Sequence, residues 1–291
     1  MKSQRTVIAL RWGSIALVLA ILAVLIIVKM TGSPANRSAA PATQPAPAAL
    51  AAQVTEIPTR IFDEIGTTST GGDVSKPITI AGQPQLVRTT ATGEKLPEIL
   101  YYGANWCPYC AAERWALVAS LSRFGTFTHL WTTSSTLLDI FPGTPTLSFE
   151  RARFSSRYVA FEAVERSTNV SAPGGGYTSL MIPTPSEAAE VNTYDTARFV
   201  GAQAAGSIPF LSIANRSLIS GAGYSPSILA GLTRAQIAAG LTDPHNPVTQ
   251  AIVATSNYLS AAICDATGNR PGRVCSSAGV EKARASLASA G

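Results

Sequence analysis

The sequence predicts an α/β fold with a central sheet, preceded by a membrane-spanning helix. An uncharged apolar run at residues 12–28 follows a basic N-terminus, which indicates the membrane helix. Farther along, the chain passes through an apolar run at 99–102, two closely spaced cysteines, an apolar helical stretch and a strand-like run at 127–133. This order of strand, helix and strand is typical of an α/β domain.

Residues 1–30 are expected to hold a single transmembrane helix. The uncharged run is seventeen residues long, and Arg11 at its start can extend the span because its charge reaches the headgroups. At ~1.5 Å per residue, about twenty residues cross the ~30 Å hydrocarbon core. Lys2, Arg5 and Arg11 precede the run, so the positive-inside rule predicts a cytoplasmic N-terminus and an extracytoplasmic remainder. A cleaved signal peptide is the alternative, although the run exceeds the usual ~7–15 residues.

Residues 31–57 are expected to form a linker. Ala, Pro and small polar residues dominate this stretch, and no large apolar residue recurs at a helical or strand period. Such a segment buries too little apolar surface to fold. The prediction therefore places a cytoplasmic N-terminus and anchor at 1–30, a linker at 31–57, and an extracytoplasmic domain at 58–291.

The charge distribution argues against nucleic-acid binding. The chain has 22 Lys and Arg against 17 Asp and Glu, for a net charge of +5. Four of the basic residues lie within residues 1–30, which leaves 18 basic against 17 acidic side chains in the rest. A protein that follows a phosphate backbone needs a basic patch on its folded part. With only His129 and His245, a histidine-rich metal centre is also excluded.

The cysteine segment begins where a strand ends. Residues 99–102 read as a buried strand and 103–105 as a turn. Pro108 suits the first position of a helix, where a missing N–H costs nothing, and this makes Cys107 the N-cap. Gly125 is expected to stop the helix, and residues 127–133 are expected to form the next strand.

Cys107 and Cys110 are the predicted reactive pair. At a helix N-terminus the sulfur of Cys107 faces unsatisfied N–H groups and the positive end of the helix dipole, and both favour the reactive thiolate. Cys110, one turn into the helix, can attack a mixed disulfide formed by Cys107. Three other uses compete with this one. A zinc site would have to recruit Cys264 and Cys275 from about 155 residues away. A structural disulfide would close only a tiny loop, and a cysteine hydrolase would leave Cys110 unexplained.

The segment Asn105-Trp106-Cys107-Pro108-Tyr109-Cys110 resembles the active site of the thioredoxin superfamily. Its Cys-Pro-Tyr-Cys core is similar to that of glutaredoxins, and Trp106 is similar to the residue before the first cysteine of thioredoxins. The superfamily also has a cis-proline before a sheet strand, packed against the cysteines. Ile208-Pro209, followed by strand-like residues 210–213 and 216–220, fits that element and implies a cis bond. An ordinary trans-proline at an edge strand is the alternative.

Residues 58–291 also resemble a membrane-anchored, thioredoxin-like family that is catalogued only as a domain of unknown function. The stretches that carry this resemblance are 144–165 and 262–275. The activity of that family is inferred from its fold. The resemblance therefore implies a thioredoxin-like central sheet and bears less on the substrate.

The sequence departs from thioredoxin in two ways. Tyr101 stands where thioredoxins keep a buried acid, six residues before the first cysteine. Glu113 is either a substitute proton acceptor or a solvated acid favoured by the helix dipole. In addition, Cys107 and Pro209 are 102 residues apart, so residues 134–200 should contain an insertion between the cysteine helix and the cis-proline strand. This insertion includes the strand-like residues 157–165 and builds either a substrate groove or scaffold.

The C-terminal part is predicted to be helical. Pro226, Thr233 and Pro247 each mark a helix start. Cys264 and Cys275 bracket a loop rich in Gly and Pro, which favours a structural disulfide in an oxidising compartment, contributing ~3 kcal/mol in the chain-entropy model. A second redox centre that exchanges with Cys107 is the alternative.

These observations together predict a thiol–disulfide oxidoreductase acting on extracytoplasmic protein thiols or disulfides. Cys107 and Cys110 react, while Ile208 and Pro209 shape the client-binding surface, and neither an organic cofactor nor a metal is implied. Whether the protein oxidises, reduces or isomerises its clients is left open. The competing hypothesis is a thioredoxin-like binding module that holds a partner at the membrane with residues 107–110 permanently oxidised.

Overall fold

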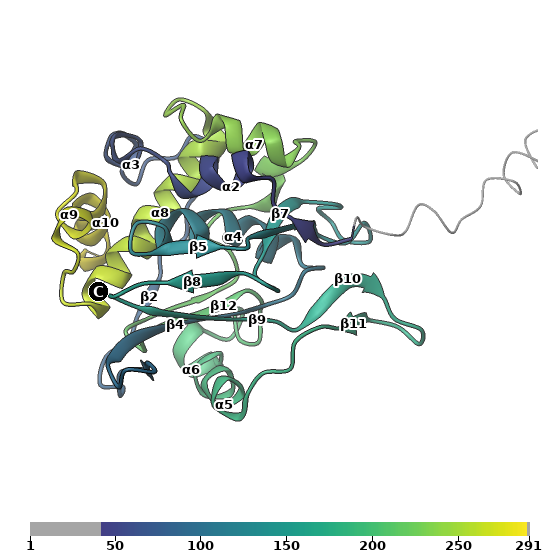
Figure 1. The fold of residues 1–291 in the computed structure, drawn as a ribbon, viewed down its shortest axis with the longest axis horizontal. Coiled ribbons are helices and arrows are strands. Elements are labelled where there is room, and N and C mark those ends of the chain that lie inside the picture. The colour runs from purple at the N-terminus through teal and green to yellow at the C-terminus, as the bar shows by residue number, and fades with distance from the viewer. Residues whose placement is uncertain (1–41, 290–291) are drawn as a thin grey trace, which may run out of the picture. The chain divides into compact units, whose positions relative to one another are not determined.

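A computed structural model describes residues 42–289, and its centre is a mixed sheet (Figure 1). The strands β2 (Ile78–Thr79), β13 (Ser217–Ser220), β12 (Phe210–Ile213), β4 (Lys95–Gly103) and β3 (Val87–Thr89) lie side by side in that order. The sixth strand, β9 (Ala160–Glu165), pairs with β4 in parallel, whereas the other pairings are antiparallel. The prediction of a mixed α/β domain is confirmed.

Strand register brings three chain segments together at the C-terminal end of β4. Phe210, at the start of β12, lies opposite Tyr102 on β4, and Glu165, at the end of β9, lies opposite Gly103. The chain then leaves β4 directly into the cysteine segment. The sheet thus places the cysteines beside the beginning of β12 and the end of β9.

Helices cover both faces of the sheet (Figure 1). On one face α4 (Pro108–Leu121) packs against α8 (Pro247–Ala266), and small side chains allow a close approach, with the Ser120 and Ser260 hydroxyls 3.0 Å apart. On the other face, α5 (Pro185–Tyr194) and α6 (Ala197–Val200) enclose a smaller apolar cluster with Phe210 and Leu218. Around α8 lie α3 (Thr59–Ile65), η2 (Pro226–Leu229), α7 (Arg234–Gly240), α9 (Gly272–Cys275) and α10 (Ala278–Ala288).

Helix starts in the C-terminal part follow the sequence signals. Pro226 and Pro247 are the first residues of η2 and α8. Thr233 caps α7 in a capping box with Gln236, so each side chain satisfies a backbone N–H of the other residue. These three predicted starts are confirmed.

A second, three-stranded sheet and two antiparallel strand pairs are formed mostly by the chain between α4 and β12, with β1 added from before α2. The second sheet has the order β1 (Gln44–Pro45), β6 (Trp131–Ser134) and β7 (Pro145–Ser148). One antiparallel pair joins β5 (Thr126–Thr128) with β8 (Arg153–Ser155), and a hairpin joins β10 (Ser167–Ser171) with β11 (Tyr177–Ser179). The sequence predicts an insertion within residues 134–200. This stretch also contains β9, which is a strand of the central sheet.

The linker predicted at 31–57 extends too far toward the C-terminus. Residues 48–55 form the helix α2 (Ala48–Thr55), and Leu50 and Val54 are buried in the main core. These two residues are four apart and share a helical face, and alanine favours the helix that presents them. The Ala-rich composition concealed this short apolar stripe, and the folded part begins before residue 58.

Two local predictions around α4 also fail. The run at 127–133 is not one strand, because His129 adopts a φ of 56° and its two halves pair with different strands, β5 with β8 and β6 with β7. The helix ends at Leu121 rather than at Gly125. Gly125 is instead a site of close approach, where a Cβ atom would collide with the carbonyl oxygen of Ser155.

Among residues 42–289, no helix combines the length and the apolarity needed to cross a membrane. The transmembrane helix predicted within residues 1–30 lies outside the described residues.

Candidate functional site

Cys107 and Cys110 stand at the start of α4, as the sequence predicts. Cys107 is the N-cap, and its sulfur accepts a hydrogen bond from the backbone N–H of Cys110 at 3.4 Å. Pro108 follows as the first helical residue. Both cysteines are free thiols, and Cys107 retains 4% of its surface exposed while Cys110 has none. Cys107 is therefore the less deeply buried of the two cysteines.

The proline segment lies against the first thiol. The Ile208–Pro209 peptide bond is cis, as predicted. The thiol of Cys107 donates to the carbonyl oxygen of Ile208 at 3.5 Å, across 101 residues of chain. Phe210 then begins β12 next to β4. The fold thus brings together Cys107, Cys110, Ile208 and Pro209, which are far apart in the sequence.

A buried ion pair lies behind the thiols. Arg114 binds Glu165 through two hydrogen bonds, Nε to Oε1 at 2.8 Å and Nη2 to Oε2 at 2.7 Å, and both side chains are fully buried. Arg114 Nη2 also donates to the carbonyl oxygen of Ala104 at 2.8 Å. Burial alone would lower the pKa of Arg114, but the Glu165 carboxylate together with Tyr101 and Cys110 outweighs it and raises that pKa. A permanent positive charge therefore stands near both thiols.

The environment drives the two thiol pKa values apart. A hydrogen bond with the Cys110 thiol lowers the pKa of Cys107, and the backbone N–H of Cys110 and the charge of Arg114 act in the same direction. Complete burial raises the pKa of Cys110 well above its ordinary value, and the neighbouring Cys107 raises it further. Cys107 is thus favoured as the thiolate and Cys110 as the thiol.

Tyr101 stands six residues before Cys107, at the position where thioredoxins, which this segment resembles, keep a buried acid. Its ring lies edge-on to Phe149, with centroids 5.0 Å apart, and burial raises the pKa of its phenol well above the usual value. Gly103 keeps this region open, because a Cβ atom there would collide with the Tyr101 hydroxyl and lie 3.0 Å from the Cys110 sulfur. Tyr101 thus supplies a neutral hydroxyl beside Cys110 rather than a carboxylate.

Glu113 is not a solvated acid. Its side chain is 0% exposed, and one carboxylate oxygen accepts from the backbone N–H of Gly223 at 2.7 Å. Burial raises its pKa to about 7. Its position in the first turns of α4 is compatible with a solvated acid favoured by the helix dipole. The packing of α4 against the segment around Gly223 buries it instead. That one hydrogen bond gives Glu113 no link to either thiol.

Aromatic residues flank the cysteines on the surface. The indole of Trp106 donates to the Ser167 hydroxyl at 3.1 Å and stacks on Tyr177 at a centroid distance of 5.0 Å. Tyr109 is exposed and meets the ring of Phe141 edge-on. The hairpin β10–β11 and the loop before β7 therefore form the walls on either side of the site.

Cys264 and Cys275 form a disulfide, as predicted. The helices α4 and α8 run in the same direction, because Ala116 contacts Ser256 and Ser120 contacts Ser260. Cys264 therefore lies near the far end of α4 from Cys107, and a helix of fourteen residues is about 20 Å long. This separation disfavours direct exchange between the two cysteine pairs.

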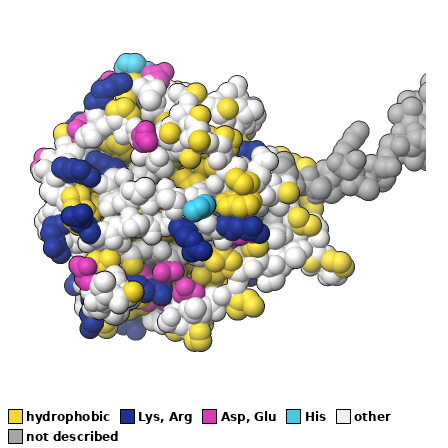
Figure 2. Space-filling model, viewed as in Figure 1, with side chains coloured by type: hydrophobic (Ala, Val, Ile, Leu, Met, Phe, Trp, Pro, Cys, Tyr) yellow, Lys and Arg dark blue, Asp and Glu magenta, His cyan; other side chains and the backbone are white. Residues whose placement is uncertain are grey.

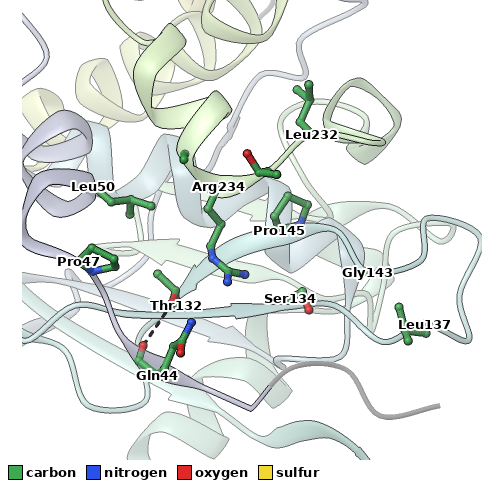
Figure 3. Close-up of a pocket in the computed structure, with 12 residues that line it drawn as sticks. Gln44, Pro47, Leu50, Thr132, Ser134, Leu137, Gly143, Pro145, Leu232 and Arg234 are labelled. Carbon is green, nitrogen blue, oxygen red and sulfur yellow. Dashed lines mark hydrogen bonds between the residues drawn. The ribbon is translucent and has the colours of Figure 1, made fainter. Parts of the chain in front are cut away.

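A cavity of about 510 Å³ lies apart from the thiols, between β6, α2 and the start of α7 (Figure 3). Its walls include Pro47, Leu50 and Leu232, and Arg234 donates to the backbone oxygen of Thr133. Neither Cys107 nor Cys110 lines it. Within residues 42–289, no three His, Cys, Asp or Glu side chains gather in a way that could hold a metal ion.

Sequence reasoning missed Arg114 and Glu165. Arg114 stands four residues after Cys110 and seven after Cys107, so all three share one helical face, and this spacing was a readable signal. Glu165 ends the strand-like stretch 157–165, but nothing in the sequence pairs it with Arg114. Only the register of β9 against β4 brings the carboxylate to the helix.

Comparison with protein families gives one match. The family model DUF929, described as a domain of unknown function, matches residues 85–265, which is well over half of the chain. The matched region includes the cysteine pair of α4 and the proline segment before β12. The comparisons with curated proteins and with solved structures gave no match. The chain therefore belongs to the DUF929 family.

Proposed function

We propose that this protein is a thiol–disulfide oxidoreductase on a thioredoxin-like scaffold, anchored at a membrane and acting on extracytoplasmic proteins. The observation that carries the proposal is the setting of Cys107. Its sulfur caps a helix, accepts the N–H of Cys110 and lies 3.5 Å from the carbonyl oxygen before cis-Pro209. The cap position and the N–H of Cys110 favour a nucleophilic thiolate, which a structural cysteine does not need, while the Ile208 carbonyl accepts from the sulfur in its protonated form.

The topology supports the thioredoxin-like assignment. The cysteines follow the central strand β4, and the cis-proline precedes β12, the antiparallel neighbour of β4. The parallel neighbour β9 and the helices on both faces complete an α/β arrangement around the pair. The resemblance of residues 105–110 and 208–213 to the superfamily concerns the same two elements that meet in space.

The chemistry is two successive exchanges. The thiolate of Cys107 attacks one sulfur of a client disulfide, which forms a mixed disulfide and releases the other client sulfur as a thiolate that takes up a proton. Cys110 then loses its proton and attacks the sulfur of Cys107. The second client thiol leaves, and a Cys107–Cys110 disulfide remains. Two electrons pass from the protein to the client, and the reverse sequence oxidises a client dithiol.

The coupling between the thiols supports this order of steps. In the reduced state the neighbouring Cys107 is among the causes that raise the pKa of Cys110. Formation of the mixed disulfide removes the negative charge of Cys107, so that part of the penalty disappears. The positive charge of Arg114 then favours the Cys110 thiolate. Cys110 thus becomes a nucleophile at the stage where the reaction needs one.

Activity with protein substrates tests the proposal. The full chain should reduce insulin or oxidise a reduced, unfolded protein, and Cys107→Ser should abolish both activities. Cys110→Ser should accumulate mixed disulfides with clients, and Cys107→Ser/Cys110→Ser should not. If the wild-type dithiol exchanges with neither proteins nor small disulfides, the oxidoreductase proposal fails and the binding-module hypothesis replaces it.

A further inference from the structure

Exposed apolar side chains gather around the thiols. Among residues 42–289, eight large apolar side chains are exposed, and five of them lie on the segments that surround Cys107. Leu138 and Ile140 are the most prominent of these, at 65% and 73% exposure. We call this set the apolar rim; its members are Tyr109, Leu137, Leu138, Ile140 and Val170. Soluble surfaces seldom concentrate such residues without a contact partner.

The rim is attached directly to the candidate active site. The backbone N–H of Thr136, at the start of the rim loop, donates to the carbonyl oxygen of Trp106 at 2.9 Å. Phe141, within that loop, meets the ring of Tyr109 at a centroid distance of 6.0 Å. The hairpin that carries Val170 is held by the bond from Trp106 to Ser167. Whatever the rim contacts therefore lies next to Cys107.

The rim also lies at the end of the domain where the described chain begins. Strand β1 pairs with β6 in antiparallel register, Gln44 opposite Thr132, and the Thr43 hydroxyl donates to Thr133. Followed backwards from Gln44, the chain therefore runs toward Ser134, and the rim loop starts immediately after Ser134. Ala42, the first residue that the structure describes, therefore lies beside the rim loop.

The connecting segment is short. Only fifteen residues, 29–43, separate the apolar run at 12–28 from Gln44. Even fully extended, fifteen residues span at most about 50 Å. A bilayer holding residues 12–28 is therefore within reach of the rim.

We propose that the apolar rim lies on the lipid surface, with Leu138 and Ile140 at the boundary between headgroups and acyl chains. This orientation directs Cys107 toward cysteines of other membrane proteins that lie close to the bilayer, and in that respect it rests on the proposed function. Interfacial binding of this kind depends on protruding apolar side chains, with Tyr favoured at headgroup depth.

A lipid surface explains the shape of the rim better than a soluble client does. Leu138 and Ile140 are largely exposed and do not line the cavity of Figure 3, whereas Leu137, beside them in the rim, does. Side chains that protrude suit a fluid layer, whereas a peptide needs a groove. Hydrophobic and uncharged side chains prevail at the right-hand end of the face in Figure 2, and lipid contact would place the partly exposed carboxylate of Asp139, between Leu138 and Ile140, among the headgroups.

Photocrosslinking of the full chain in phosphatidylcholine vesicles tests this contact. A benzophenone amino acid is placed at position 138 or 140, and at 78 or 87 as matched controls. Ile78 and Val87 are also exposed, but β2 and β3 pair with strand ends remote from the cysteines. We expect lipid adducts from 138 and 140 and few from 78 and 87. Equal labelling, adducts with protein alone, or failure of the chain to float with the vesicles would overturn the proposal.

Exchange rates separate this proposal from the proposed function. The variant Leu138→Ser/Ile140→Ser should react about tenfold more slowly than wild type with a disulfide peptide anchored in the vesicle, because orientation sets the effective concentration. Its reaction with a small soluble disulfide should be unchanged, and Ile78→Ser/Val87→Ser should match wild type in both assays. Equal loss with both substrates would contradict the lipid contact. If wild type reacts with neither substrate while lipid adducts still form, only the proposed function fails.

Discussion

Arg114 connects the reactive pair to the rest of the fold at the scale of single residues. Its guanidinium is held by Glu165 and the Ala104 carbonyl, while its charge favours the thiolate forms of Cys107 and Cys110. Arginine suits this place because its planar fork binds a carboxylate through two bonds and stays charged when buried. The same side chain therefore serves both stability and thiol chemistry.

Substitution of Arg114 should separate these two effects. Arg114→Met leaves the Glu165 carboxylate buried without its partner, so the free energy of unfolding should fall by about 3–5 kcal/mol. Loss of the positive charge should also raise the pKa of Cys107 by up to about one pH unit. Thiolate absorbance measured across pH reports the pKa, and denaturant titration reports the stability.

The paired variant Arg114→Met/Glu165→Met is the matched control. It removes both charges, so most of the lost stability should return while the pKa of Cys107 stays raised. If that pKa equals the wild-type value in both variants, Arg114 has no role in thiol chemistry.

Glu113 should make stability depend on pH. Its pKa is raised by burial from 4.5 to about 7, so the folded state binds its proton more tightly than the unfolded state. The stabilisation is fully present below pH 4.5 and is lost as the pH rises through about 7, by about 3 kcal/mol. In Glu113→Gln this decline should disappear, which denaturant titrations between pH 4.5 and 8 would measure. Glu281→Gln, at an exposed position of α10, is the control and should keep the wild-type slope.

At the scale of elements, the disulfide joins α8 to α9. Cys264 and Cys275 lie at the opposite end of α4 from Cys107, where the helix cap and Arg114 favour the Cys107 thiolate and therefore its release from a disulfide. A mild reductant should therefore open an oxidised Cys107–Cys110 pair and leave Cys264–Cys275 intact. Alkylation followed by mass spectrometry measures which thiols are released. Reduction of both pairs at the same potential would favour a relay between them.

The elements that the sequence could predict are those specified by neighbouring residues. The N-cap at Cys107 and the capping box of α7 each depend on a few adjacent positions, whereas the cis bond before β12 was expected from the resemblance to the thioredoxin superfamily. The burial of Glu113 and the pairing of Arg114 with Glu165 depend on packing between elements. The break at His129 depends on two different strand partners. Such long-range contacts have no counterpart in local patterns.

The whole domain depends on residues before position 58. Leu50 and Val54 of α2 are buried in the main core, and β1 pairs with the outer edge of β6. Deletion of residues 1–57 should therefore lower the free energy of unfolding by about 1.5–3 kcal/mol for each of the two side chains. The variant that lacks only residues 1–41 keeps both elements and is the control. Equal thermal unfolding of the two variants would show that α2 contributes nothing.

The distance along the chain between the partners of the thiol site also determines when the site matures. Ribosomes make proteins from the N-terminus onward. Cys107 and Cys110 are therefore made well before Glu165, which follows Arg114 by 51 residues, and before Ile208, which follows Cys107 by 101. During this interval the two cysteines lack the ion pair behind them and the carbonyl in front. The nascent chain thus carries a dithiol of ordinary reactivity, and its redox character is acquired only when the domain closes.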